Sequence, residues 1–194
     1  MSCAVEVDRS PEDLCDALLA ARRGERVEIF LAQMLTSWAL GMGSLSGWMG
    51  LSRLRFQEMM AYHFPRFDPQ LLGEPNRWPD PERAQESTEL RQLLQQGRTP
   101  GEREDPLLCD IVIAGCMGED HLWQDLGLWS RKELSQLMQE QFAPLAKRND
   151  KDMKWKKFLY KQLCETEGIY TCRAPSCEQC HDYELCFGPE EGGV

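Results

Sequence analysis

Hydrophobic positions recur along this chain at the spacing of α-helices, and no segment alternates in the manner of a β-strand. Ser10 and Pro11 are typical of a helix start, and the pattern predicts a helix over residues 11–23. A second helix, apolar on most of its faces, is expected over residues 25–40. Apolar residues at helical spacing then predict a third helix that ends before Pro65. The N-terminal third of the chain is therefore expected to be helical.

Polar connectors follow these helices. Four prolines fall within residues 67–81, so residues 65–83 are predicted to form an irregular connector without a regular element. Residues 84–96 read as a polar surface helix. Residues 97–105 combine glycine, proline and charged side chains, and we expect a solvated, charged linker there.

The C-terminal half again has helical periodicity. Residues 107–117 predict its most hydrophobic helix, with Cys109 and Cys116 on the same face as core residues. Ser130 and Glu133 form a capping box for the next helix. A last helix is expected from Asn149 or Asp150 to residue 167.

These patterns predict an all-α fold made of one helical domain, residues 1–168, followed by a cysteine-rich metal-cluster loop and tail, residues 169–194. A length of 194 residues suits a single domain. The uncharged segment 29–52 contains polar residues and glycines, and a core helix followed by a turn explains it better than a membrane span.

The net charge and the N-terminal sequence argue against some classes of partner and against secretion. A net charge of -10 argues against nucleic acid and anionic membranes as partners, because their phosphates would repel the protein. The N-terminus has neither a basic nor an apolar segment of the kind found in secretory signals. We expect a cytoplasmic protein whose partners are proteins or small ions.

Four of the nine cysteines lie within fifteen positions, Cys172, Cys177, Cys180 and Cys186, spaced C-x4-C-x2-C-x5-C. Thiolates this close in sequence can converge on one soft metal centre, and the first three match the spacing of plant-type ferredoxins. A structural zinc site is the alternative, although only Cys177 and Cys180 form a C-x2-C arm. Disulfides are less favoured because these two cysteines are awkwardly close. The spacing therefore favours an iron-sulfur cluster and leaves zinc open.

A basic stripe leads into this cysteine motif. Four lysines share one face of the last predicted helix: Lys151, Lys154, Lys157 and Lys161. Such a stripe is commonly a solvated helix face. Its position beside the cysteines also suits attraction of an oxyanion or an acidic partner.

Three sequence blocks together are distinctive. They are DHLWQDLGL at residues 120–128, MKWKKF at residues 153–158, and the cysteine motif, in that order. With these blocks the chain resembles the NifQ family, nitrogen-fixation proteins that supply molybdenum for the nitrogenase iron-molybdenum cofactor. The resemblance is clearest from about residue 50 onward, and no function is transferred to the first fifty residues.

The resemblance implies an iron-sulfur protein that binds molybdenum in a Mo-Fe-S cluster and donates it to the NifEN/NifH cofactor-assembly proteins. It would be a metal-cluster carrier rather than an enzyme, with molybdate as the molybdenum source. The family's cysteine motif corresponds to the four cysteines above without any departure in spacing.

Further candidates lie outside the motif. Cys164 and His121 are possible additional metal ligands, although a core position for Cys164 and a hydrogen-bonded turn for His121 explain them as well. Molybdate contacts are expected at Lys154, Lys157 and Lys161. The alternative function is a protein-interaction module with a structural zinc site in the C-terminal loop. No arrangement typical of a cysteine-nucleophile enzyme is evident.

Overall fold

The computed structural model describes residues 10–75, 77, 84–101, 107–166, 183–188 and 190. These residues form α-helices and one 3-10 helix, and the only extended pairing among them is an isolated bridge between Trp48 and Leu51. The all-α prediction is confirmed for the described part of the chain. The proposed domain boundary at residue 168, and Cys172, Cys177 and Cys180, lie outside the described residues and stay predictions.

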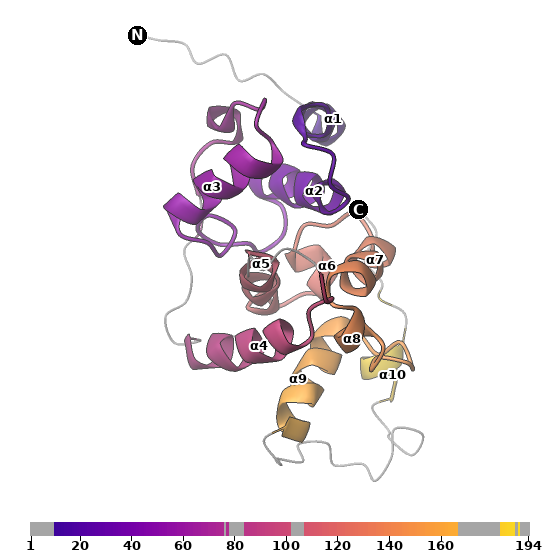
Figure 1. Ribbon diagram of the computed structural model, residues 1–194. Helices are drawn as coiled ribbons and strands as arrows, with labels where there is room; N and C mark the ends of the chain where they lie inside the picture. The colour runs from indigo at the N-terminus through magenta and orange to yellow at the C-terminus, as the bar shows by residue number, and fades with distance from the viewer. Residues whose placement is uncertain are drawn as a thin grey trace.

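Three helices gather at one end of the molecule: α1 (Pro11–Ala21), α2 (Val27–Ala39) and α3 (Arg53–His63), shown in indigo to purple in Figure 1. The predicted start of the first helix is confirmed, because the Ser10 hydroxyl accepts a hydrogen bond of 3.2 Å from the Asp13 amide. Helix α2 is buried on nearly all faces, as its apolar sequence predicts. It packs against α1 and α7 and so joins this end to the rest of the protein.

The proline-rich connector is more ordered than predicted. Pro69–Leu72 form a 3-10 helix, η1, so the expectation of no regular element over residues 65–83 is wrong. Asp68 makes this possible because its side chain accepts a 3.0 Å hydrogen bond from the Gln70 amide, which caps the turn. Proline is tolerated at the first position of such a turn, where its missing amide is not needed.

Helices α4 (Ala84–Gln96) and α5 (Leu107–Cys116) lie in the middle of the molecule, and both match their predicted ranges closely. The described part of the charged linker, residues 97–101, is held at Thr99. Its hydroxyl donates to the Glu140 carbonyl at 2.7 Å and accepts from the Ala143 amide at 2.9 Å. The linker prediction therefore misses this attachment, which depends on residues more than forty positions away.

Helices α6 (Leu122–Asp125), α7 (Arg131–Gln141) and α8 (Ala143–Ala146) follow. The predicted helix start at Ser130 is confirmed, because its hydroxyl accepts from the Glu133 amide at 3.3 Å. The Glu133 carboxylate accepts from the Ser130 hydroxyl at 3.1 Å, whereas a capping box would have it accept from the backbone amide. Helix α8 continues from α7 after a bend at Phe142, a short element that the sequence pattern did not separate.

The last long helix, α9 (Trp155–Thr166), begins about five residues later than predicted. Asn149 is the reason, because its side chain accepts from the Met153 amide and donates to the Met153 carbonyl, at 2.9 Å and 2.8 Å. Asp152 adopts a φ of 54°, which no helix interior allows. The segment before Trp155 is therefore a closed turn.

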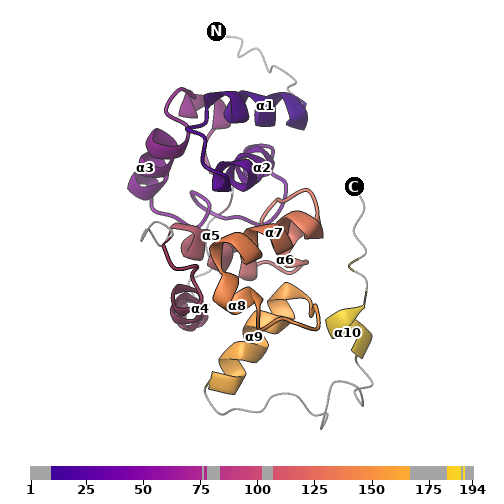
Figure 2. The ribbon, with the colours of Figure 1, turned by 45° about the vertical axis from the view of Figure 1, so that its right-hand side comes forward.

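A short helix, α10 (Tyr183–Phe187), lies within the segment predicted to be a loop. The prediction of non-helical structure is thus wrong for these residues, whose Tyr183 and Phe187 rings stack at a centroid distance of 4.5 Å one turn apart. Figure 2 shows α10, in yellow, beside the start of α9. Among the described residues, no helix combines the length and the apolar character needed to cross a bilayer.

One hydrophobic core runs through α1–α9, with Phe56, Phe64 and Phe142 among its largest fully buried side chains. Two polar side chains of α2 form hydrogen bonds with residues of the C-terminal half. The Ser37 hydroxyl donates to the Gly127 carbonyl at 2.7 Å, and the Gln33 amide donates to the Glu133 carboxylate at 2.7 Å. These bonds fix the position of the 120–128 block, from which the candidate site is built.

Candidate functional site

The 120–128 block folds around one turn of helix, α6. The His121 amide donates to the Gln124 side chain at 3.2 Å, and the His121 carbonyl accepts from the Asp125 amide at 3.0 Å. His121 thus takes the position before the first helical residue, with an extended backbone. This placement leaves its imidazole at the edge of the turn, about one-third exposed.

Asp125 is the buried polar centre of this region, with 2% of its surface exposed. Its carboxylate pairs with the ammonium group of Lys156, which also donates to the Gly118 carbonyl at 2.9 Å. A Cβ at Gly118 would lie 2.2 Å from an Asp125 carboxylate oxygen and from the Ser44 hydroxyl, so only glycine fits there. The 120–128 block, the 41–50 loop and α9 therefore meet around the ion pair between Asp125 and Lys156.

Helix α10 is held at the start of α9 by Lys154. The Lys154 amide donates to the Cys186 carbonyl at 2.8 Å, and the Lys154 ammonium donates to the Glu184 carbonyl at 3.1 Å. Both bonds use backbone oxygens of α10. Cys186, the last cysteine of the predicted motif, is half-buried and packs against the hydrophobic core.

Glu190 adds a second attachment just beyond α10. Only 4% of its side chain is exposed, and its carboxylate lies 3.3 Å from the Arg131 guanidinium and 3.9 Å from the His121 imidazole. Arg131 also binds both carboxylate oxygens of Asp152, at 2.7 Å and 2.9 Å. Hydrogen bonding to Asp152 raises the pKa of the Arg131 guanidinium; burial opposes this, and the charges of Asp152 and then Glu190 add to it. Arg131 therefore bridges the turn before α9 and the segment after α10.

An open pocket of about 490 Å³ lies between these elements. We call it the α9–α10 pocket; its lining residues include His121, Lys154, Lys157, Tyr160, Leu185 and Glu190. The acidic side chains of Glu119 and Asp120 also reach it, so its charge is mixed rather than uniformly positive. Because Lys156 is neutralised by Asp125, Lys154 and Lys157 are the lysines that can meet an anion here.

The predicted site residues divide between two places. His121, Lys154 and Lys157 line the same pocket, whereas Lys161 lies outside that lining and pairs with Glu165 at 3.6 Å. Cys164 is half-buried in α9. Because it lies ten residues beyond Lys154, about 15 Å along the helix at 1.5 Å per residue, the structure does not bring Cys164 and Cys186 together.

The two α5 cysteines are core residues, as predicted. Cys109 and Cys116 are each 1% exposed. Burial raises the pKa of the Cys109 thiol to about 11, so the thiol is protonated at neutral pH. Cys116 also reaches the wall of the α9–α10 pocket.

Sequence reasoning missed Asp125, Lys156, Arg131 and Glu190. Lys156 falls in a recognised block, but it lies off the face that carries the other lysines, and nothing local connects it to Asp125 thirty-one positions earlier. Glu190 and Arg131 are likewise joined only by the tertiary fold. Ion pairs between residues this far apart in the sequence can be found only from the structure.

Comparison with known proteins supplies the family. The NifQ family model matches residues 30–188. The chain is 40% identical over 185 residues to the protein NifQ of Azotobacter vinelandii, a match that covers 90% of this chain and 95% of that relative.

This chain belongs to the NifQ family. The protein NifQ of Rhodobacter capsulatus is 35% identical over 172 residues, which covers 86% of this chain and 90% of that protein. A NifQ homologue of Sinorhizobium fredii is 39% identical over 144 residues, which covers 74% of this chain and 62% of the homologue. No solved structure matches the chain significantly. The resemblance seen in the sequence is therefore confirmed, and the matched segment of this NifQ family member includes the whole cysteine motif and all lining residues of the α9–α10 pocket except Glu190.

Proposed function

We propose that this NifQ family member carries molybdenum in an iron-sulfur cluster bound by Cys172, Cys177, Cys180 and Cys186, and donates that molybdenum to assembly of the nitrogenase iron-molybdenum cofactor. The observation that carries the proposal is the family match over residues 30–188, which contains all four cysteines in one motif. The protein acts in this scheme as a carrier of metal rather than as an enzyme.

The chemistry of the ligands supports this assignment. Thiolates are the preferred ligands of iron-sulfur clusters, and four of them within fifteen residues can surround one small cluster. When bound, such a cluster supplies sulfide-rich coordination in which molybdenum can be held and from which it can leave. A tetrahedral zinc site closed by four thiolates offers no comparable open position.

Molybdate enters this proposal as the substrate. Lys154 and Lys157 line the α9–α10 pocket, and Lys154 is bonded to the helix that carries Cys186. A tetrahedral oxyanion held there by two ammonium groups and the His121 imidazole would lie next to the last residue of the cysteine motif. Lys161, paired with Glu165 outside the pocket lining, contributes less in this arrangement.

The proposed recipients are the NifEN/NifH cofactor-assembly proteins that the family resemblance implies. Recognition between proteins fits the acidic composition, with a net charge of -10, better than recognition of a polyanion does.

Metal analysis of anaerobically purified protein tests the cluster. We expect brown protein that contains iron and sulfide, and molybdenum when molybdate is supplied during expression. Cys177→Ala should lose iron and molybdenum together. Cys15→Ala is the matched control, because Cys15 is buried in α1 at the opposite end of the molecule from α10.

Colourless protein with one tightly bound zinc per chain would overturn the proposal and support the interaction module with a structural zinc site. Iron that survives Cys177→Ala would instead show that the motif is not the cluster site.

The role of the pocket lysines is tested separately. The double variant Lys154→Glu/Lys157→Glu should lower molybdenum loading several-fold while iron content stays unchanged, because charge reversal repels molybdate without removing a thiolate. The control Lys132→Glu/Lys147→Glu makes the same charge change at two exposed lysines of the α7–α8 region. Equal molybdenum in both double variants would return Lys154 and Lys157 to the role of a solvated surface.

A further inference from the structure

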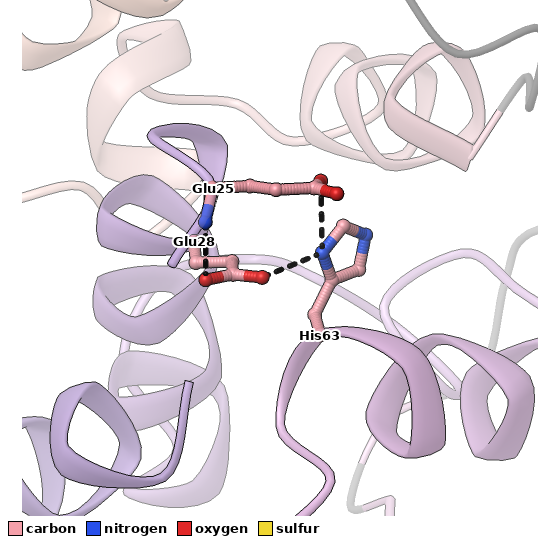
Figure 3. A group of neighbouring side chains, drawn as sticks. All are labelled: Glu25, Glu28 and His63. Carbon is pink, nitrogen blue, oxygen red and sulfur yellow. Dashed lines mark hydrogen bonds and ion pairs between the residues drawn. The ribbon is translucent and has the colours of Figure 1, made fainter. Parts of the chain in front are cut away.

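A second cluster of metal-ligating side chains lies far from the α9–α10 pocket. Glu25 lies two residues before α2, Glu28 lies in the first turn of α2, and His63 is the last residue of α3. Figure 3 shows the three side chains pointing toward one another. One ligand atom from each lies within 4.8 Å of the other two. We call these residues the Glu-Glu-His cluster.

Glu28 is held rigidly in this cluster. It is fully buried, and its Oε2 atom accepts hydrogen bonds from the amides of Gly24 and Glu25, at 2.7 Å and 2.9 Å. Its other oxygen, Oε1, lies 3.3 Å from His63 Nδ1. The backbone therefore satisfies one oxygen and aims the other at the imidazole.

Glu25 repeats this arrangement from the solvent side. Its Oε1 atom accepts a 2.7 Å hydrogen bond from the Tyr62 hydroxyl, and its Oε2 atom lies 3.7 Å from the same His63 Nδ1. The side chain is 42% exposed, so it closes the cluster without sealing it. Each carboxylate thus has one oxygen fixed by an outer partner and one oxygen directed inward.

Charge in the cluster is not balanced. Two carboxylates face one histidine, and among the described residues both carboxylates form their ion pairs with His63. Arg23 is near, but its guanidinium lies over the Tyr62 ring, 4.3 Å from the ring centroid. A neutral imidazole would leave a buried carboxylate with no cation, an arrangement that costs free energy unless a cation or a proton enters.

We propose that the Glu-Glu-His cluster binds a divalent first-row transition-metal ion such as Mn²⁺ or Fe²⁺. Two carboxylate oxygens and one imidazole nitrogen suit these ions, and their charge balances a divalent cation. Bond lengths of about 2.0–2.2 Å would bring the three ligand atoms to roughly 3–4 Å from one another, a shift of an ångström or less. The hydrogen bonds to Gly24, Glu25 and Tyr62 act as outer partners that orient the ligands.

The site is independent of the molybdenum proposal. It lies at the α1–α3 end of the molecule, and both glutamates precede residue 30, where the family model match begins. Its ligands are oxygen and nitrogen, whereas the cysteine motif offers sulfur. The alternative is that no metal binds and a protonated His63 pairs with both carboxylates. The experiment below distinguishes this alternative from metal binding.

Mn²⁺ binding to the full-length protein, followed by the electron paramagnetic resonance signal of free Mn²⁺, tests the proposal. Mn²⁺ is chosen because it has little affinity for thiolates. We expect saturation at one Mn²⁺ per chain. Glu25→Gln and His63→Gln should each weaken binding by at least about tenfold, and Tyr62→Phe should weaken it by roughly tenfold through loss of an outer partner.

Glu58→Gln is the matched control, since Glu58 is an exposed carboxylate of α3 outside the cluster, and it should bind Mn²⁺ like the unmodified protein. Glu25 is partly exposed, so its variant is expected to fold, and circular dichroism checks this. Absence of saturable binding up to millimolar Mn²⁺ would assign the cluster to a protonated histidine. Equal affinity of the Glu25→Gln and Glu58→Gln proteins would overturn the site as well.

Discussion

Two buried carboxylates, Glu28 and Asp125, are treated differently by the fold. Glu28 is bound by two backbone amides and faces a histidine and a second carboxylate. Asp125 is paired directly with Lys156, whose ammonium also reaches the Gly118 carbonyl. Both side chains lie near the start or end of a short connection between helices, and both are almost fully excluded from water.

Charge balance separates the two sites. At Asp125 the single negative charge is matched by a lysine of the protein, so the ion pair is complete and structural. At Glu28 the negative charge exceeds what His63 can match, and the surplus favours an added cation. Burial of a carboxylate alone therefore does not identify a binding site; the count of opposing charges around it does.

The largest expected effect comes from breaking the complete pair. Lys156→Met leaves Asp125 buried without a cation and should lower the free energy of unfolding by about 3 kcal/mol, measured by urea denaturation. Lys157→Met changes a neighbouring exposed lysine and should stay within about 0.5 kcal/mol. The double variant Asp125→Asn/Lys156→Met should recover much of the loss. If the double variant is as unstable as Lys156→Met, the loss of stability comes from packing around Lys156 and not from the unpaired charge of Asp125.

A buried thiol of α5 gives a pH-dependent effect of intermediate size. Burial raises the pKa of Cys109 from 9.0 to about 11, so the folded state keeps a proton that the unfolded state releases. This contribution to stability is present below pH 9 and is lost as the pH rises toward 11. Between pH 8 and pH 10, the free energy of unfolding should therefore fall by about 1 kcal/mol more in the unmodified protein than in Cys109→Ala. If the free energy of unfolding changed with pH equally in the two proteins, the thiol of Cys109 would not be buried and protonated as described.

The smallest expected effect is on the stability of the metal-free protein when the Glu-Glu-His cluster is changed. Glu25→Gln removes one of two like charges while its amide oxygen can still accept from the Tyr62 hydroxyl, so the metal-free free energy of unfolding should change by less than about 0.5 kcal/mol. Chelator-treated protein is used for this measurement. A loss comparable to that of Lys156→Met would place Glu25 in a structural pair like that of Asp125 and would weaken the distinction between the two carboxylates.

Local sequence signals predicted the parts of the fold that depend on neighbouring residues. Ser10 and Ser130 each cap the helix that follows, as their positions indicate, and the apolar face of α5 is buried. The start of α9 was misplaced because Asn149 and Asp150 both look like helix starts. The side chain of Asn149 closes a turn with Met153 instead.

Long-range charge pairing was not predictable in the same way. Glu28 and His63 are thirty-five positions apart, and neither belongs to a recognisable motif. His121 was identified from its block, but its place beside Lys154 and Glu190 depends on how α9 and the segment after α10 return to it. Metal binding by the four cysteines, Cys172, Cys177, Cys180 and Cys186, remains a prediction from their spacing.

The bond from the Lys154 amide to the Cys186 carbonyl is a main-chain contact, so this bond does not depend on which side chain position 186 carries. Any residue presents the same carbonyl, so Cys186→Ala removes the thiol while the main-chain contact persists. A change in bound iron in that variant therefore reports on loss of the Cys186 side chain, while the main-chain bond that holds α10 to Lys154 is still available.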